Sequence, residues 1–175
     1  MSDEGPAPLA LVVEDERTMV RLLRAALTSH GYRVVEASSG EEALRQAATR
    51  APDVVVLDLG LPDLDGLEVT RRLREWSAVP IVVVSARGQE GDKIKALDAG
   101  ADDYVTKPFS VGELLARMRV ALRHAARSAT DAGETTVCVG GLRLDRLRRQ
   151  VFVDEAEVRL TPIEYRLLSA LAQYA

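Results

Sequence analysis

The chain has 175 residues, of which 47% are hydrophobic and 29% charged, and its net charge is -4; this is the composition of an ordinary globular protein. Neither residues 1–125 nor residues 126–175 carry an excess of Lys and Arg, so the charge pattern gives no sign of a nucleic-acid-binding surface. The single cysteine, Cys138, excludes a disulfide framework within the chain, and the apolar run near the start is too short for a signal peptide or a membrane span. We therefore expect a cytoplasmic protein with no membrane partner.

The first two-thirds of the chain alternates short runs rich in Val and Ile with segments that have apolar residues at helical spacing. The runs predict strands at residues 9–13, 32–37, 53–58, 81–86 and 103–106. Helices are expected at residues 16–29, 41–50, 66–76, 89–98 and 111–126. Strands that alternate with helices form βαβ units, so this part predicts an α/β domain with a doubly wound, five-stranded parallel sheet.

The pattern changes after residue 126. Small and polar residues indicate a linker at residues 127–135, and four short alternating runs then predict a small antiparallel sheet. The stretch "LTPIEYRLL" opens a helix in which Thr161 is the expected N-cap, Pro162 takes the first helical position and Glu164 completes a capping box. No stop signal follows this helix, so the second domain looks incomplete.

Polar side chains follow the strands at one edge of the predicted sheet. Glu14 and Asp15 follow the first strand, Asp58 the third, Ser85 the fourth and Lys107 the fifth. If the strand order is 2-1-3-4-5, the first and third strands are neighbours, and the three carboxylates converge where such sheets bind ligands. Each residue alone has a simpler interpretation: a helix cap for Asp15, a turn hydroxyl for Ser85 and a surface lysine for Lys107.

Three close carboxylates repel one another and raise one another's pKa values unless a cation lies among them. A divalent ion that prefers oxygen, most simply Mg²⁺, resolves this conflict, with four expected ligands: the side chains of Glu14, Asp15 and Asp58 and the backbone carbonyl of Gly60. Phosphoryl transfer suits such a site, because the Asp58 carboxylate can accept a phosphoryl group as an acyl phosphate. Lys107 would add a second positive charge, and Ser85 could hydrogen-bond a phosphate oxygen.

Five motifs, in this order and spacing, resemble those of two-component response regulators of the OmpR/PhoB family: "LVVEDE", "VVLDLGLPDLDG", "VVVSARG", "ALDAGADDYVTKPF" and "LTPIEYRLL". The resemblance implies a flavodoxin-like receiver domain at residues 8–126, of strand order 2-1-3-4-5. It also implies the first part of a winged-helix DNA-binding domain at residues 136–175. Within the family, "WSAVP" and the motifs around it are most similar to regulators of potassium-uptake operons.

The resemblance also implies roles for single residues. Asp58 would accept its phosphoryl group from a sensor histidine kinase, and Ser85 would be the switch hydroxyl. Tyr104 matches the aromatic residue that turns inward when this hydroxyl engages the phosphate. Lys107 matches the lysine that precedes a usually cis proline, here Pro108.

Homodimerisation on phosphorylation is a further implication of the resemblance, through the helix–strand–helix face at residues 89–125. The candidates on this face are charged residues of both signs and an apolar patch: Lys93, Ile94, Leu97, Asp98, Asp102, Asp103, Glu113, Leu115, Arg117, Arg119 and Arg123. The alternative is a solvated charged surface, since a single surface salt bridge contributes little.

The elements that would read DNA, a recognition helix and a wing hairpin, do not follow the last predicted helix. We therefore expect promoter DNA to be a partner of the full-length regulator and not of this chain alone. Three alternatives remain: a family member that serves another pathway, a receiver that acts only as a phosphate relay or interaction module, and a metal-dependent phosphatase with an aspartyl nucleophile. The phosphatase would need an acid where this chain has Gly60, so we expect no enzyme.

Overall fold

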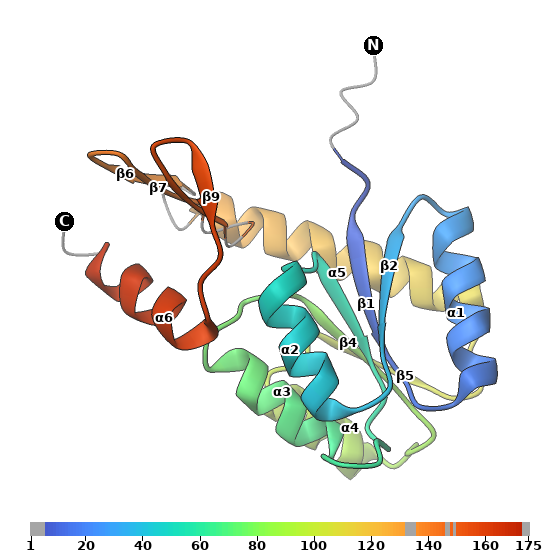
Figure 1. Cartoon of the computed structure of the whole chain (residues 1–175). Helices are drawn as coiled ribbons and strands as arrows, with labels where there is room; N and C mark the ends of the chain where they lie inside the picture. The colour runs from blue at the N-terminus through green and yellow to red at the C-terminus, as the bar shows by residue number, and fades with distance from the viewer. Residues whose placement is uncertain (1–5, 132–135, 146–147, 149, 173–175) are drawn as a thin grey trace.

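The chain forms a five-stranded parallel sheet with helices on both faces, followed by a smaller antiparallel sheet and one helix (Figure 1). This computed structural model describes residues 6–131, 136–145, 148 and 150–172. The large sheet has the order β2-β1-β3-β4-β5, which confirms the predicted topology. Its strands are β1 (Leu9–Val13), β2 (Arg33–Ala37), β3 (Val54–Leu57), β4 (Ile81–Ser85) and β5 (Asp103–Thr106). Its helices are α1 (Arg17–Ser29), α2 (Gly40–Arg50), α3 (Gly66–Arg74), α4 (Glu90–Asp98) and α5 (Val111–Asp131).

Alternate residues of the central strands pack into two separate cores. In β1, Leu11 and Val13 lie in the core covered by α2, α3 and α4, whereas Ala10 and Val12 lie in the core covered by α1 and α5 (Figure 1). A strand buried on both faces has no solvated side, which is why it reads as a continuous apolar run. In β1, β3 and β4 the only polar residue is therefore Ser85, at the end of β4, and the acids Glu14 and Asp58 follow β1 and β3.

Helix α5 is longer than the sequence suggested. It continues to Asp131, so residues 127–131, which were expected to begin the linker, are helical; residues 132–135 of that linker lie outside the described residues. The physical reason is composition, because the stretch contains Ala and Arg and neither Gly nor Pro before residue 132.

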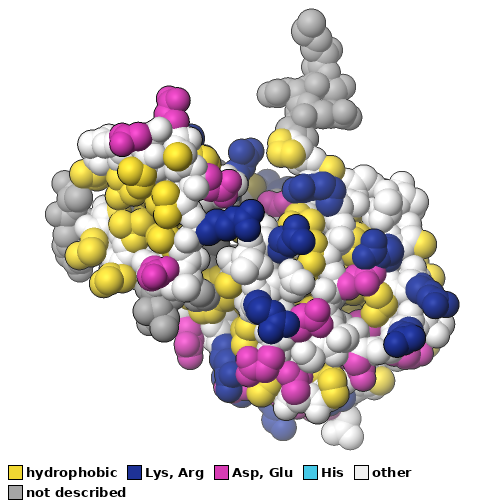
Figure 2. Space-filling model, viewed as in Figure 1, with side chains coloured by type: hydrophobic (Ala, Val, Ile, Leu, Met, Phe, Trp, Pro, Cys, Tyr) yellow, Lys and Arg dark blue, Asp and Glu magenta, His cyan; other side chains and the backbone are white. Residues whose placement is uncertain are grey.

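The second part of the chain contains a four-stranded antiparallel sheet and α6 (Pro162–Leu171), as expected for the start of a winged-helix domain. The capping box is present: the Thr161 N–H donates to Glu164 Oε2 at 2.7 Å, and the Glu164 N–H donates to Thr161 Oγ1 at 3.4 Å. Hydrophobic side chains gather on the surface of this part (Figure 2). The strands, in sheet order, are β6 (Thr136–Val139), β7 (Leu142–Asp145), β8 (Gln150–Val153) and β9 (Ala156–Val158).

None of the helices in the described part of the chain combines the length and the hydropathy that crossing a bilayer requires.

Gly66, the first residue of α3, lies against the loop that follows β3. A Cβ at this position would lie 2.6 Å from the carbonyl oxygen of Asp58 and 2.7 Å from the Cα of Leu59. Because both contacts are with backbone, we expect Gly66→Ala to lower the free energy of unfolding by about 3 kcal/mol, measured by urea denaturation. Gly112→Ala is the matched control, since its Cβ would meet nothing within 4 Å. Equal losses in the two variants would contradict the steric explanation.

Candidate functional site

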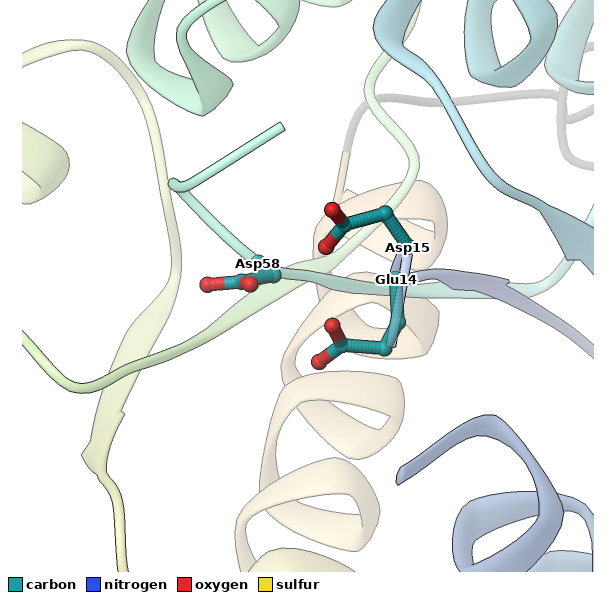
Figure 3. Close-up of side chains that lie close together, drawn as sticks. All are labelled: Glu14, Asp15 and Asp58. Carbon is teal, nitrogen blue, oxygen red and sulfur yellow. The ribbon is translucent and has the colours of Figure 1, made fainter. Parts of the chain in front are cut away.

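Three carboxylates meet at the carboxyl-terminal edge of the large sheet (Figure 3). Glu14 and Asp15 follow β1, and Asp58 follows the neighbouring strand β3. The Asp58 N–H donates to the carbonyl of Val13 at 2.9 Å, so the pairing of the two strands continues to their ends and brings Asp58 beside Glu14. One oxygen from each of the three carboxylates lies within 4.8 Å of the others. The convergence predicted from the strand order is therefore present.

Lys107, just after β5, supplies a positive charge to this cluster. Its Nζ lies 2.7 Å from Glu14 Oε2 and 3.4 Å from Asp58 Oδ2. Burial opposes the charged ammonium, but the two carboxylates outweigh it, and the pKa of Lys107 is raised. The Lys107–Pro108 peptide bond is cis, and the Lys107 N–H donates to the carbonyl of Ser85 at 2.8 Å. The two ion pairs place the lysine side chain at the carboxyl-terminal edge of the sheet.

Glu14 is the most deeply buried acid of the cluster, with 3% of its surface exposed. Burial raises its pKa, and the hydrogen bonds from Lys107 and from the N–H of Glu16 only partly oppose this effect. One lysine therefore does not fully compensate the buried charge. Asp15 is exposed and does not cap α1, whose N-cap is Glu16. One of its carboxylate oxygens lies close to those of Glu14 and Asp58. This set of oxygen donors fits a hard divalent cation.

Ser85 and Tyr104 are both linked to the loop between β4 and α4. Ser85 ends β4 with 2% of its surface exposed, and its Oγ accepts a hydrogen bond from the N–H of Arg87 at 3.1 Å. Tyr104, on β5, is buried, and its hydroxyl donates to the carbonyl of the same Arg87. Gly60 lies beside the acids, where its N–H donates to Asp58 Oδ1 at 3.3 Å. Lys107 and Gly60 therefore contact the acids, whereas the side chains of Ser85 and Tyr104 bond to Arg87 in the loop between β4 and α4.

Three residues that the sequence analysis did not single out also hold the loop after Asp58. Asp65 caps α3 through a 2.8 Å bond from the N–H of Leu67, and it pairs with Arg87 Nη1 at 3.0 Å. Asp63 accepts bonds from two N–H groups at the start of α2. An Asp just before a helix is a recognisable N-cap signal, so Asp65 was open to prediction. Asp63 had no such signal, since its partners are distant in the sequence.

One residue of the expected dimer face lies elsewhere. Leu115 was expected in an exposed apolar patch, but it is 3% exposed and packs in the core between α5 and the sheet. The correction follows from helix geometry, because adjacent Leu114 and Leu115 both fall on the broad stripe that α5 presents to the sheet. Ile94 and Leu97 on α4 are exposed at 51% and 47%, and Val120 on α5 is exposed at 39%.

Several charges of the expected dimer face have partners within the chain. Arg117 Nη1 lies 3.0 Å from Asp103 Oδ1, and its Nη2 lies 3.2 Å from Glu113 Oε1. Asp102 Oδ2 accepts bonds from Arg74 Nη2 at 2.9 Å and from the N–H of Ile81 at 2.7 Å. The remaining candidates are exposed: Lys93, Asp98, Arg119 and Arg123.

Comparison with known proteins places this geometry in a family. Residues 10–119 match the model of the response regulator receiver domain. The chain is 54% identical over 165 residues to the KDP operon transcriptional regulatory protein KdpE of Escherichia coli, covering 94% of this chain and 72% of that protein. It is 48% identical to the transcriptional regulatory protein KdpE of Mycobacterium tuberculosis, covering 94% of this chain and 73% of that protein.

Solved receiver domains share the fold. The BeF3-activated receiver domain of Klebsiella pneumoniae RstA matches with a TM-score of 0.64 and 36% identity, over 66% of this chain and 98% of that one. The receiver domain of the Pseudomonas aeruginosa sensor histidine kinase PA1611, which has a magnesium ion coordinated in its active site cleft, matches with a TM-score of 0.63 and 34% identity. That match covers 67% of this chain and 98% of the other.

The similar curated proteins are transcriptional regulators, which confirms the expectation of a regulator and not an enzyme. With its acid cluster at the edge of a 2-1-3-4-5 sheet and its match over residues 10–119, the chain belongs to the response regulator receiver family.

Proposed function

We propose that this chain is a phosphorylation-activated regulator of transcription in which Asp58 accepts a phosphoryl group from a sensor histidine kinase in the cytoplasm. The observation that carries the proposal is the cluster of Glu14, Asp15 and Asp58 with Lys107 bonded into it. The similarity of the chain to the KdpE proteins supports a role at a potassium-uptake operon. A family member that serves a different pathway is the alternative.

In the proposed reaction, a carboxylate oxygen of Asp58 attacks the phosphorus of a phosphohistidine. The new O–P bond forms an acyl phosphate as the N–P bond breaks, and the imidazole leaves with the bonding electrons and takes up a proton. Lys107 already lies 3.4 Å from Asp58 Oδ2, so its ammonium is in place for the negative charge on the transferred group. The buried hydroxyl of Ser85 stands at the end of the neighbouring strand, where it would hydrogen-bond the bound phosphoryl group.

We propose Mg²⁺ as the ion held at the cluster, with the side chains of Glu14, Asp15 and Asp58 and the carbonyl of Gly60 around it. When bound, Mg²⁺ neutralises negative charge on the phosphoryl oxygens. The incompletely compensated Glu14 and the exposed Asp15 support this assignment, as does the magnesium ion in the similar Pseudomonas receiver.

Mg²⁺ is expected to stabilise the fold, and acid is expected to remove the effect. At a Mg²⁺ concentration about 10 times its Kd, the free energy of unfolding should rise by about 1.4 kcal/mol. Because burial raises the pKa of Glu14, protonated Glu14 favours the folded metal-free chain at low pH, and this contribution is lost as pH rises through the raised pKa. Mg²⁺ competes with that proton, so its effect should be largest at neutral pH and shrink as pH falls.

Thermal unfolding with and without Mg²⁺, between neutral pH and the acidic range, measures this effect. The Glu14→Gln variant has no titrating group at this position, so its stabilisation by Mg²⁺ should depend less on pH. A stabilisation by Mg²⁺ that stays constant across the range would contradict the assignment of Glu14.

We propose that the signal passes from Asp58 through Ser85 and Tyr104 to the surface formed by α4, β5 and α5. Both residues contact Arg87 in the loop that leads into α4, so a change at Ser85 would be felt at that helix. The proposed domains are a receiver at residues 8–126 and the start of a winged-helix domain at residues 136–175. They are joined by a linker at residues 127–135, whose first five residues continue α5. Promoter DNA would be the target of a regulator with the full length of the KdpE relatives.

Phosphorylation is expected to produce a homodimer through α4, β5 and α5. The exposed Ile94 and Leu97 supply an apolar patch, and the exposed Lys93, Asp98, Arg119 and Arg123 supply charges of both signs. The pairs of Arg117 with Asp103 and Glu113, and of Asp102 with Arg74, would have to open or be shared for these residues to bridge the two copies.

Sedimentation with the phosphoryl mimic beryllofluoride tests the dimer. Leu97→Ser should weaken dimerisation by at least about 10-fold, because it removes an apolar side chain from the interface. Leu22→Ser on α1 is the matched control, since Leu22 is similarly exposed at 49% on the opposite layer. A wild-type chain that stays monomeric with beryllofluoride would contradict the proposed face.

A further inference from the structure

We propose that Asp63 is a positioning residue that ties the loop after Asp58 to the N-terminus of α2 and so sets the affinity of the site for Mg²⁺. The proposal rests on the proposed function for the identity of the ion. The contacts of Asp63 are intrachain and stand without it.

The carboxylate of Asp63 bonds to two backbone N–H groups of α2. Oδ1 accepts from Gly40 at 2.7 Å, and Oδ2 accepts from Glu41 at 2.9 Å. The third N–H of this turn, that of Glu42, bonds to the N-cap Ser39. The first N–H groups of a helix have no intrahelical acceptor, and a negative charge is favoured there by the helix dipole. Asp63 therefore completes the cap of α2 from a different segment of the chain.

Packing reinforces these bonds. A Cβ on Gly40 would lie 2.8 Å from the Cβ of Leu64 and 2.8 Å from Cγ2 of Val69, so the first residue of α2 is in close contact with the residue that follows Asp63. The backbone hydrogen bonds also lower the pKa of Asp63, which keeps its carboxylate charged at neutral pH. The loop is thus fixed to α2 by charge and by shape at the same point.

This loop follows Asp58 and carries Gly60, and its two ends are bonded to each other. Gly60 forms an isolated β-bridge with Asp65, and the Gly66 N–H donates to the carbonyl of Leu59 at 3.0 Å. Asp65 anchors the loop to α3. Asp63 is the corresponding anchor to α2, so without it the segment between Gly60 and Asp63 loses a fixed point. Groups that orient metal ligands in this way commonly change metal affinity when they are removed.

Calorimetric titration of the chain with Mg²⁺ tests the proposal. Asp63→Ala should weaken Mg²⁺ binding by about 10-fold. Asp63→Asn should lose less, because its amide oxygen still accepts one bond while its NH₂ group faces the other N–H. Hydrogen exchange at the Gly40 and Glu41 amides should accelerate in both variants, which gives a readout independent of metal.

Asp53→Ala is the matched control. Asp53 also accepts a bond from a distant backbone N–H, that of Leu9 at 2.7 Å, but it lies at the opposite end of β3. It should lose stability and keep the wild-type affinity for Mg²⁺.

A folded Asp63→Ala variant with wild-type affinity for Mg²⁺ would overturn the proposal. An equal loss of Mg²⁺ affinity in Asp53→Ala would also overturn it, because it would indicate a general effect of lower stability. If Asp63→Ala does not fold, Asp63→Asn decides by the same comparison. Failure of the wild type to bind Mg²⁺ would contradict the proposed metal site itself, and with it this role of Asp63. If the wild type binds no Mg²⁺ and its Gly40 and Glu41 amides exchange slowly, the bonds from these amides to Asp63 have only a structural role.

Discussion

Asp58→Asn is expected to abolish phosphorylation of the chain. With Mg²⁺ and a small phosphodonor such as acetyl phosphate, the wild type should gain one phosphoryl group that is stable in acid and labile in base, as acyl phosphates are. The amide of Asn is nearly the same size but is a very poor nucleophile, so the loss should be complete while the fold is kept. Intact-mass spectrometry before and after alkaline treatment measures the modification.

The same strand provides the control for this experiment. Asp53 precedes β3 and Asp58 follows it, so Asp53→Asn changes the same type of side chain at the opposite edge of the sheet. This variant should be phosphorylated as the wild type is. Equal labelling of Asp58→Asn and the wild type would show that the acceptor is another residue.

Lys107→Met is expected to slow phosphorylation by about 100-fold. This is the order of effect seen when one preorganised group that stabilises the charge of the transition state is removed. Met retains a long apolar stem but lacks the ammonium that lies 2.7 Å from Glu14 and 3.4 Å from Asp58. Without it, the pKa of the buried Glu14 should rise further, because the hydrogen bond that lowers it is lost. Initial rates of labelling by a small phosphodonor measure the first effect.

Lys95→Met, on the exposed surface of α4, is the control for the loss of one positive charge from the chain. It should leave the rate unchanged, since Lys95 is not part of the acid cluster. A normal rate in Lys107→Met, or an equal decrease in Lys95→Met, would contradict a local role of Lys107 in the transfer.

The fold of the first part of the chain was predictable because its pattern is redundant. Each central strand is a short apolar run, and each intervening helix has an apolar stripe, so a parallel sheet with two covered faces is the arrangement that buries all of them. The capping box of Thr161 and Glu164 was predictable for a similar reason, since both partners lie within one turn. Where the signal was weaker, at the end of α5, the expected boundary was wrong.

The acid cluster was predictable to the extent that strand ends share an edge. Glu14, Asp15 and Asp58 were placed together by strand order alone, and the pairing of β1 with β3 confirmed it. Leu115 shows the limit of this reasoning. A leucine in an amphipathic helix can face the core or a partner, and only the width of the stripe that α5 buries decided for the core.

By itself, the sequence determined the order of strands and helices, the edge at which the acids gather and the identity of the acid that ends β3, because these depend on local patterns repeated along the chain. The tertiary structure alone decided which charges pair. Arg117 with Asp103, Arg74 with Asp102 and Asp63 with the start of α2 are contacts between separate elements. Such partners are set by the packing of helices on the sheet. The sequence around a charged residue does not predict which distant group that residue will contact.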